Sequence, residues 1–373
     1  MRVEKRTVLA IFSDVNFSPQ LVAVLKELRN RQISTRIILI GNHDTLIAKQ
    51  IQSFGWEMRM IKKRGKFASV FNFILIFKET VMHQPTVVFA SGQFATILGI
   101  LVARVMNVPE RVFVRHHSNY HHLYKMRVGI LLDKIANRLA TKIVAVSSTV
   151  KNILVNFEKA SAKKISVIYN GIELETFQKP PRTLDHQKKQ GNTKEKTFRI
   201  GVISRLTDCK GVEYTARAFI RIQSEFAGCH LHVVGAPADA DYDVRTILSE
   251  INSDLYTLDT EKADIPSFLQ NLSAFVHVPN GSEDEAFGLV YIEALASGVP
   301  SIFTISGILN ELENPNKYSH IVGYRSSEEI YSNLKSILKT GYKPKDAIPN
   351  IWLDQFSLEQ MSIKYADLLL DGR

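Results

Sequence analysis

Short apolar runs rich in β-branched residues recur along the chain, and they restrict its fold more than any other feature. Segments with helical spacing of apolar residues, such as QLVAVLKELRNR and EYTARAFIRIQSEF, separate many of them. The runs are, in chain order, TVLAIF, RIILIG, TVVFAS, RVFVRH, KIVAVS and SVIYNG, then RIGVIS, HLHVVG, AFVHVP and PSIFTI. Strands that are apolar along their whole length are typical of parallel sheets covered by helices on both faces. The alternation therefore predicts an α/β fold.

A polar segment divides the runs into two series. The chain has 373 residues, more than one hydrophobic core usually organises, so we expect two domains. Residues 178–197 read QKPPRTLDHQKKQGNTKEKT, which is the composition of a linker. We predict an N-terminal domain over residues 1–177 and a C-terminal domain over residues 198–355. Residues 356–373 form an amphipathic pattern that predicts a terminal helix packing back on the N-terminal domain.

The composition favours a globular protein of a reducing compartment. Hydrophobic residues make up 45% and charged residues 23% of the chain, as in globular proteins. Cys209 and Cys229 are too few for a disulfide framework and lack the spacing of a thiolate metal site. The start of the chain reads as a first strand rather than a signal peptide, and no stretch reaches the ~20 apolar residues of a spanning helix. These features predict a cytoplasmic location.

The formal net charge of +10 predicts attraction to polyanions. Nucleic acid, anionic lipid and phosphorylated substrates are all candidates, but no recognition helix or RNA-binding aromatic signature occurs, so we expect no nucleic-acid partner. Residues 62–77 combine four basic side chains with four phenylalanines. This stretch is either a core helix after a solvated basic turn or a docking site for an anionic membrane surface on the inner face of the cytoplasmic membrane.

Residues 279–304 carry the most informative pattern, PNGSEDEAFGLVYIEALASGVPSIFT. A strand leads into a polar loop and then into a helix that Gly298 closes. The start of a helix presents unpaired backbone N–H groups and a partial positive charge, so it is suited to a diphosphate. Gly288 would allow the ligand close to the backbone. The candidate contacts around this helix start are Phe287, Gly288, Leu289 and Val290.

Two glutamates and two cations accompany this helix start. Glu293 lies in the helix, where a carboxylate accepts both hydroxyls of a ribose, and Glu285 precedes it by eight positions, where a sugar on the diphosphate would display its hydroxyls. Arg205 and Lys210 follow the first strand of the second domain in GVISRLTDCKG. Fixed cations of this kind stabilise a departing nucleoside diphosphate, so no metal ion and no other cofactor are expected.

Together the motifs SRLTDCKG, EDEAFGLVYIEALASGVPSI and KIVAVSSTVKNIL followed by KISVIYNGIELETF resemble the retaining glycosyltransferases of glycosyltransferase family 4. The resemblance covers both domains and the linker. It implies the GT-B fold, two Rossmann-like α/β domains facing across a cleft, with the donor on the C-terminal domain and the acceptor mainly on the N-terminal one. It also implies that Glu285 and Glu293 form the family's E-x7-E signature and that Arg205 and Lys210 bind the donor phosphates.

The resemblance assigns a histidine after a first-domain strand to either His116 or His117, and the sequence does not choose between them. The segment SDVNFSPQ lacks the glycine pair that the family often has after its first strand, Ala286 replaces a commoner glycine, and the later glycine pair is Ser306–Gly307. A metal site is the alternative for the histidine-rich segment HHSNYHH, but no accompanying cysteine or carboxylate pattern supports it.

The predicted activity is retaining, metal-independent transfer from a nucleoside-diphosphate sugar, UDP-linked rather than GDP-linked. The acceptor is a saccharide or a lipid-linked saccharide, and the role is surface polysaccharide or glycoconjugate assembly. A sugar-nucleotide epimerase or phosphorylase on the same fold is an alternative, and a non-catalytic carbohydrate-binding relic is another. A dinucleotide dehydrogenase is disfavoured because no G-x-G-x-x-G follows a strand.

Overall fold

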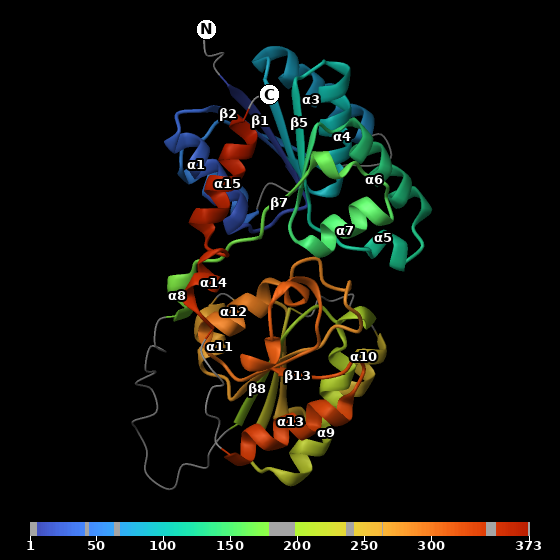
Figure 1. Cartoon of the computed structure of the whole chain (residues 1–373), viewed down its shortest axis with the longest axis vertical. Helices are drawn as coiled ribbons and strands as arrows, with labels where there is room; N and C mark the ends of the chain where they lie inside the picture. The colour runs from blue at the N-terminus through green and yellow to red at the C-terminus, as the bar shows by residue number, and fades with distance from the viewer. Residues whose placement is uncertain are drawn as a thin grey trace. The chain divides into compact units, whose positions relative to one another are not determined.

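The computed structural model describes residues 6–41, 45–62, 68–178, 198–235, 242–262, 264–340 and 348–371. The chain divides into two compact units, one formed by Met1–Ile172 with Gln355–Arg373 and the other by Glu173–Asp354. Each unit is built on one parallel sheet with helices packed against it (Figure 1). In the described part of the chain, no helix is both long and apolar enough to cross a membrane.

The first unit contains a seven-stranded sheet in the order β3-β2-β1-β4-β5-β6-β7. Its strands are β1 (Thr7–Ser13), β2 (Ser34–Ile40), β3 (Met58–Ile61), β4 (Val87–Ser91), β5 (Glu110–Arg115), β6 (Lys142–Ala145) and β7 (Ile165–Val167). Strand β1 pairs in parallel with both β2 and β4, so the chain reverses its direction of winding between β1 and β4. Ligands of open α/β sheets bind outside the carboxyl ends of the strands at such a switch point.

Helices cover both faces of this sheet. They are α1 (Pro19–Asn30), α2 (Leu46–Ser53), α3 (Ala68–His83), α4 (Gln93–Val105), α5 (Tyr120–Leu123), α6 (Arg127–Leu139), α7 (Ser148–Asn156) and α15 (Leu358–Leu370). Helix α4 packs against α3 and α6 on one side of the sheet, whereas α1 packs against α15 on the other (Figure 1). Because both faces are covered, β1 and β4 are buried almost throughout, as their apolar runs predict.

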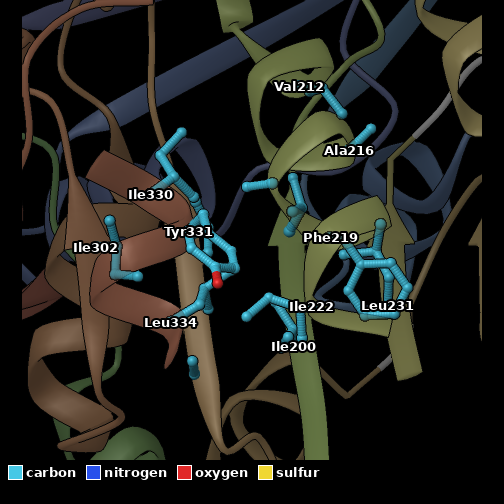
Figure 2. Close-up of a cluster of buried hydrophobic side chains, with 14 of the residues drawn as sticks. Ile200, Val212, Ala216, Phe219, Ile222, Leu231, Ile302, Ile330, Tyr331 and Leu334 are labelled. Carbon is cyan, nitrogen blue, oxygen red and sulfur yellow. The ribbon is translucent and has the colours of Figure 1, made fainter. Parts of the chain in front are cut away.

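The second unit contains a six-stranded sheet in the order β10-β9-β8-β11-β12-β13. Its strands are β8 (Phe198–Ile203), β9 (Cys229–Val234), β10 (Tyr256–Asp259), β11 (Ala274–His277), β12 (Ser301–Phe303) and β13 (His320–Ile321). Its helices are α8 (Leu174–Gln178), α9 (Val212–Glu225), α10 (Tyr242–Leu248), α11 (Ile265–Gln270), α12 (Leu289–Ser297), α13 (Ser327–Thr340) and α14 (Asn350–Asp354). Phe219 and Ile222 of α9 share one buried cluster with Tyr331 and Leu334 of α13 (Figure 2).

The chain passes into the second unit at Glu173, earlier than the boundary after residue 177 that the sequence suggested. The reason is the packing of α8, which contacts α11 and α12, with Gln270 Nε2 donating to the carbonyl of Phe177 at 2.9 Å. Apart from Gln178, the expected linker 178–197 lies outside the described residues.

The terminal helix α15 belongs to the first unit. Met361, Tyr365 and Leu369 are buried, and the helix packs along α1. A bridge between Ile172 and Ser357 holds the chain where it returns from the second unit. The apolar face of this helix therefore completes the core of the first unit.

Replacing Leu369 tests this packing, because its side chain is fully buried in α15. We expect Leu369→Ala to lower the free energy of unfolding by about 2–5 kcal/mol through loss of apolar burial and a residual cavity. The half-buried Leu368 of the same helix is the matched control, and Leu368→Ala should cost less. Urea unfolding measures both, and equal small effects would contradict the packing of α15 described above.

Candidate active site

The start of α12 is built on a glycine. Gly288 is the N-cap residue with φ +82, and no side chain caps the helix. A Cβ at this position would approach the Tyr291 ring to 2.5 Å, so the left-handed conformation and the lack of space both require glycine. Phe287 is buried just before this turn, and Leu289 and Val290 are half-buried just after it. The uncapped backbone N–H groups of this helix start are suited to an anion.

Glu285 lies between two donors. Lys210 Nζ is 2.5 Å from Glu285 Oε1, and His277 Nε2 is 3.0 Å from the same oxygen. The side chains of Glu285 and Lys210 are only 14% and 11% exposed. Burial alone would raise the pKa of Glu285, but the hydrogen bond from His277 and the charge of Lys210 outweigh it and lower the pKa to about 2. The Glu285 carboxylate therefore stays ionised near neutral pH.

A second glycine brings Lys210 to this carboxylate. Gly211 has φ +65, and a Cβ would lie 2.0 Å from the carbonyl oxygen of Val278, so no other residue fits without backbone movement. The Asn280 N–H donates to the carbonyl of Cys209 at 3.0 Å across the same contact. The turn after β8 and the loop after β11 are thereby joined, although Lys210 and Glu285 are far apart in sequence.

Glu293 occupies a different environment on α12. Burial raises its pKa to about 7, and among the described residues no hydrogen bond or charge offsets that effect. The two glutamates of the predicted pair therefore differ in charge near neutral pH, Glu285 being ionised and Glu293 partly protonated. Arg205 is exposed beyond the end of β8, outside the Lys210–Glu285–His277 cluster.

In the first unit, the structure separates the two candidate histidines. His116 follows β5, and its Nε2 lies 3.0 Å from Ser91 Oγ at the end of the neighbouring β4. The surrounding protein and the nearby His117 lower the pKa of the exposed His116 below its ordinary value, so this imidazole is neutral near pH 7. His116 is therefore placed at the carboxyl edge of the sheet, beside the switch point.

His117 instead points into a buried polar network. Its Nε2 lies 3.3 Å from Asp133 Oδ2 of α6, and the same oxygen accepts from His121 Nδ1 at 2.6 Å. Arg115 Nη2 approaches this oxygen to 3.0 Å and also pairs with Glu158. Burial lowers the pKa of His117 in spite of the hydrogen bond to Asp133.

His117, His121 and Asp133 are close enough to be considered as metal ligands, since their ligand atoms lie within 4.8 Å of one another. An ion there would have to share the Asp133 oxygen with the Arg115 guanidinium. Charged hydrogen bonds already engage that oxygen, so the geometry favours an ion-pair network over a metal site. The other two histidines of the predicted cluster lie elsewhere, His116 on Ser91 and His122 3.9 Å from Glu158.

Sequence reasoning missed two residues that hold Glu285 in place. His277 ends β11 as a buried polar residue in an apolar strand, which is the signal that would have identified it. Ser306 stands where the family often has glycine, yet its Oγ accepts from the Glu285 N–H at 3.0 Å and donates to the carbonyl of Gly281 at 2.8 Å. The Ser306 hydroxyl, which a glycine would lack, therefore stabilises the loop that carries Glu285.

Two family profiles match consecutive parts of the chain. The profile described as Glycosyltransferase Family 4 matches residues 21–176, and the profile described as Glycosyl transferases group 1 matches residues 184–351. The chain is a family 4 glycosyltransferase. The family predicted from the motifs is confirmed, and with it the assignment of the chain as a transferase.

Relatives and solved structures agree with this assignment. The glycosyltransferase is 25% identical over 319 residues to the capsular polysaccharide biosynthesis glycosyltransferase CapM of Staphylococcus aureus, with 82% of each chain covered. It is 25% identical over 279 residues to the alpha-monoglucosyldiacylglycerol synthase of Streptococcus pneumoniae, covering 69% of this chain and 59% of that one. The structure of HepE from Anabaena in complex with UDP and glucose aligns with TM-score 0.75 at 18% identity, covering 97% of this chain and 99% of that one. These similarities confirm the GT-B fold with its two Rossmann-like units.

The raised pKa of Glu293 predicts that the free energy of unfolding depends on pH. Its ordinary value is 4.5 and its folded value is about 7, so between these values the folded glycosyltransferase keeps a proton that the unfolded chain has lost. This contribution to stability is complete below pH 4.5 and is lost as the pH rises through 7. We expect Glu293→Gln to stabilise the protein relative to wild type by about 1–3 kcal/mol more at pH 8 than at pH 5.

Urea unfolding at the two pH values measures this difference. Glu250→Gln, which changes an exposed glutamate of the same unit, is the control. If the stabilisation by Glu293→Gln does not grow with pH, ionisation of Glu293 does not lower the free energy of unfolding.

Proposed function

We propose that this glycosyltransferase catalyses retaining, metal-independent transfer of a sugar from a UDP-sugar to a saccharide or lipid-linked saccharide acceptor. The observation that carries the proposal is the Glu285 carboxylate, held ionised between Lys210 and His277 in the loop that leads to the uncapped start of α12. A fixed carboxylate can bind the hydroxyls of a sugar, and a fixed cation can stabilise the leaving phosphate. A helix N-terminus can bind a diphosphate.

The donor contacts follow from the positions of these groups. Backbone N–H groups from Phe287 to Val290 bind the diphosphate, and Gly288 lets it approach the backbone. Glu293, further along α12, accepts the ribose hydroxyls, and Glu285 orients the sugar. UDP rather than GDP is supported by HepE, whose structures contain UDP and UDP-glucose.

The chemical step needs no nucleophile from the protein. The acceptor hydroxyl oxygen forms a bond to the anomeric carbon on the face from which the diphosphate departs, and the bond from that carbon to the phosphate oxygen breaks. The hydroxyl proton passes to the departing phosphate. The protein acts by positioning the reactants and stabilising charge.

The acceptor and the location form the remaining part of the proposal. His116 presents a neutral imidazole at the carboxyl edge of the first unit, where it can bind an acceptor hydroxyl. Relatives named as a capsular polysaccharide biosynthesis glycosyltransferase and as an alpha-monoglucosyldiacylglycerol synthase support surface polysaccharide or glycoconjugate assembly. Such acceptors place the enzyme in the cytoplasm, bound peripherally to the inner face of the cytoplasmic membrane.

Two alanine variants separate the roles of the glutamates. Glu293→Ala should weaken UDP and UDP-sugar alike by about ten- to a hundredfold, because the ribose does not change during the reaction. Glu285→Ala should leave UDP affinity near wild type but slow transfer at saturating donor, because sugar orientation governs the attack. Glu313→Ala changes an exposed glutamate of the same unit and is the control. The assignment fails if Glu285→Ala loses UDP affinity as severely as Glu293→Ala while its turnover stays normal.

Chelation tests the role of Lys210 and Arg205 in place of a metal ion. Because these cations are available to neutralise the departing phosphate, we expect turnover in excess EDTA to equal turnover in untreated buffer. Transfer that EDTA abolishes and that Mn²⁺ or Mg²⁺ restores would replace this mechanism with a metal-assisted one.

A further inference from the structure

A buried tyrosine lies one turn into α12, beside the proposed donor site. Tyr291 is fully buried, and its hydroxyl donates to the carbonyl of Thr304, just after β12, at 3.1 Å. A buried tyrosine needs such a partner for its hydroxyl. Burial raises the pKa of Tyr291 well above its ordinary value, so the hydroxyl stays protonated and keeps this bond near neutral pH. The polar end of the side chain is therefore fixed in position.

The ring of Tyr291 packs edge to face against two other rings. Its centroid lies 4.8 Å from that of His277, at an interplanar angle of 77°, and 4.9 Å from that of Phe303, at 88°. Edge-to-face contacts at such distances are a favoured arrangement of aromatic rings. The three rings come from β11, α12 and β12. The contacts therefore join the helix of the proposed donor site to two neighbouring strands of the sheet.

The same ring lies against the glycine turn that begins α12. A Cβ at Gly288 would come within 2.5 Å of Tyr291 Cδ2 and within 3.5 Å of Glu285 Cγ. The N–H of Tyr291 donates to the carbonyl of Gly288 at 3.1 Å. One side chain thus contacts both the turn proposed to bind the diphosphate and the histidine that binds Glu285.

His277 depends on this contact because a hydrogen bond fixes only one of its two ring nitrogens. Nε2 lies 3.0 Å from Glu285 Oε1, whereas Nδ1 is buried with no hydrogen-bond partner among the described residues. A single hydrogen bond tolerates a range of angles, so it does not by itself fix the tilt of the imidazole. The edge-to-face contact with Tyr291 limits that tilt. The direction in which Nε2 meets Glu285 therefore depends on Tyr291.

Glu285 in turn depends on His277 once the donor is bound. In the described part of the chain, Lys210 Nζ and His277 Nε2 are the side-chain donors to this carboxylate, and both bind Oε1. Oε2 is left for a hydroxyl of the sugar. Under the proposed function Lys210 also stabilises the departing phosphate, whereas His277 has no second hydrogen-bond partner among the described residues. His277 is thus the donor that can hold Glu285 in place throughout the reaction.

We propose that Tyr291 is a positioning residue for sugar transfer: through its contact with His277 it holds the Glu285 carboxylate in the orientation that binds the donor sugar. The inference rests on the proposed function, from which Glu285 takes its role. It adds to that function a side chain that is buried beneath the site. A tyrosine that only filled the core would support the fold and would not affect the sugar more than the nucleotide, so kinetics can separate the two roles.

Two substitutions of Tyr291 and a core control test the proposal. Transfer to water is followed as release of UDP, with whichever of UDP-glucose, UDP-galactose and UDP-N-acetylglucosamine the wild-type enzyme hydrolyses fastest. We expect Tyr291→Leu to lower kcat by about tenfold or more while UDP affinity stays within about twofold, because the sugar loses its orientation. Tyr291→Phe keeps the ring and should stay within about threefold of wild type. Phe219→Leu removes a fully buried ring from the α9–α13 core (Figure 2) and should lower stability but not kcat.

Two further measurements show whether Tyr291 acts through His277. In the His277→Ala background, Tyr291→Leu should lower kcat by less than about twofold, because residues that act through one contact are not additive. The acidic limb of the kcat–pH profile should move to higher pH in Tyr291→Leu, because the hydrogen bond from His277 helps to lower the pKa of Glu285. Phe219→Leu should leave that profile unchanged.

Three results would overturn the proposal: equal kcat in Tyr291→Leu and Phe219→Leu, a loss of UDP affinity in Tyr291→Leu as large as its loss of kcat, or an undiminished effect of Tyr291→Leu in the His277→Ala background. Nitrogen NMR of the His277 imidazole separates this proposal from the proposed function. The Nε2 resonance should shift in Tyr291→Leu and not in Phe219→Leu. A wild-type protein that releases UDP from none of the three donors would sink the proposed function, and the Nε2 resonance would then decide whether Tyr291 positions His277.

Discussion

Burial of both sheet faces is the constraint on which the rest of the structure depends. Parallel strands such as β1 and β4 are apolar along their length, so helices must cover them on both sides. Polar side chains are then gathered at the strand ends. His116 and Ser91 meet at the carboxyl ends of β5 and β4, and Lys210 meets Glu285 where the chain leaves β8 and β11. The site residues of each unit are consequences of this arrangement.

Local environment gives the two signature glutamates different charges. Glu285 has two donors on one oxygen, which keep its pKa at about 2, whereas burial without a partner raises that of Glu293 to about 7. Among the described residues no side chain is hydrogen-bonded to the Glu293 carboxylate, and under the proposed donor binding the ribose hydroxyls would supply such bonds. The environment thus keeps Glu285 ionised and leaves Glu293 partly protonated near neutral pH.

Buried ion pairs join helices α3 and α6 of the first unit to its sheet. Asp133 and Glu79 are buried because arginines of the sheet, Arg115 and Arg36, need carboxylate partners there. Apolar side chains of both helices are nevertheless exposed, among them Phe71 of α3 and Leu131 of α6.

The sequence by itself determined the features that depend on nearby residues. Apolar periodicity identified the strands and α15, and the spacing of Gly288 and Gly298 identified the two ends of α12. Tertiary structure alone decided that His277 binds Glu285, that His116 and His117 contact different partners, and that Glu79 of α3 and Asp133 of α6 are buried. A helical or strand period says which residues share a face but not which face is buried. That choice depends on charged partners far away in sequence, which only the folded chain brings together.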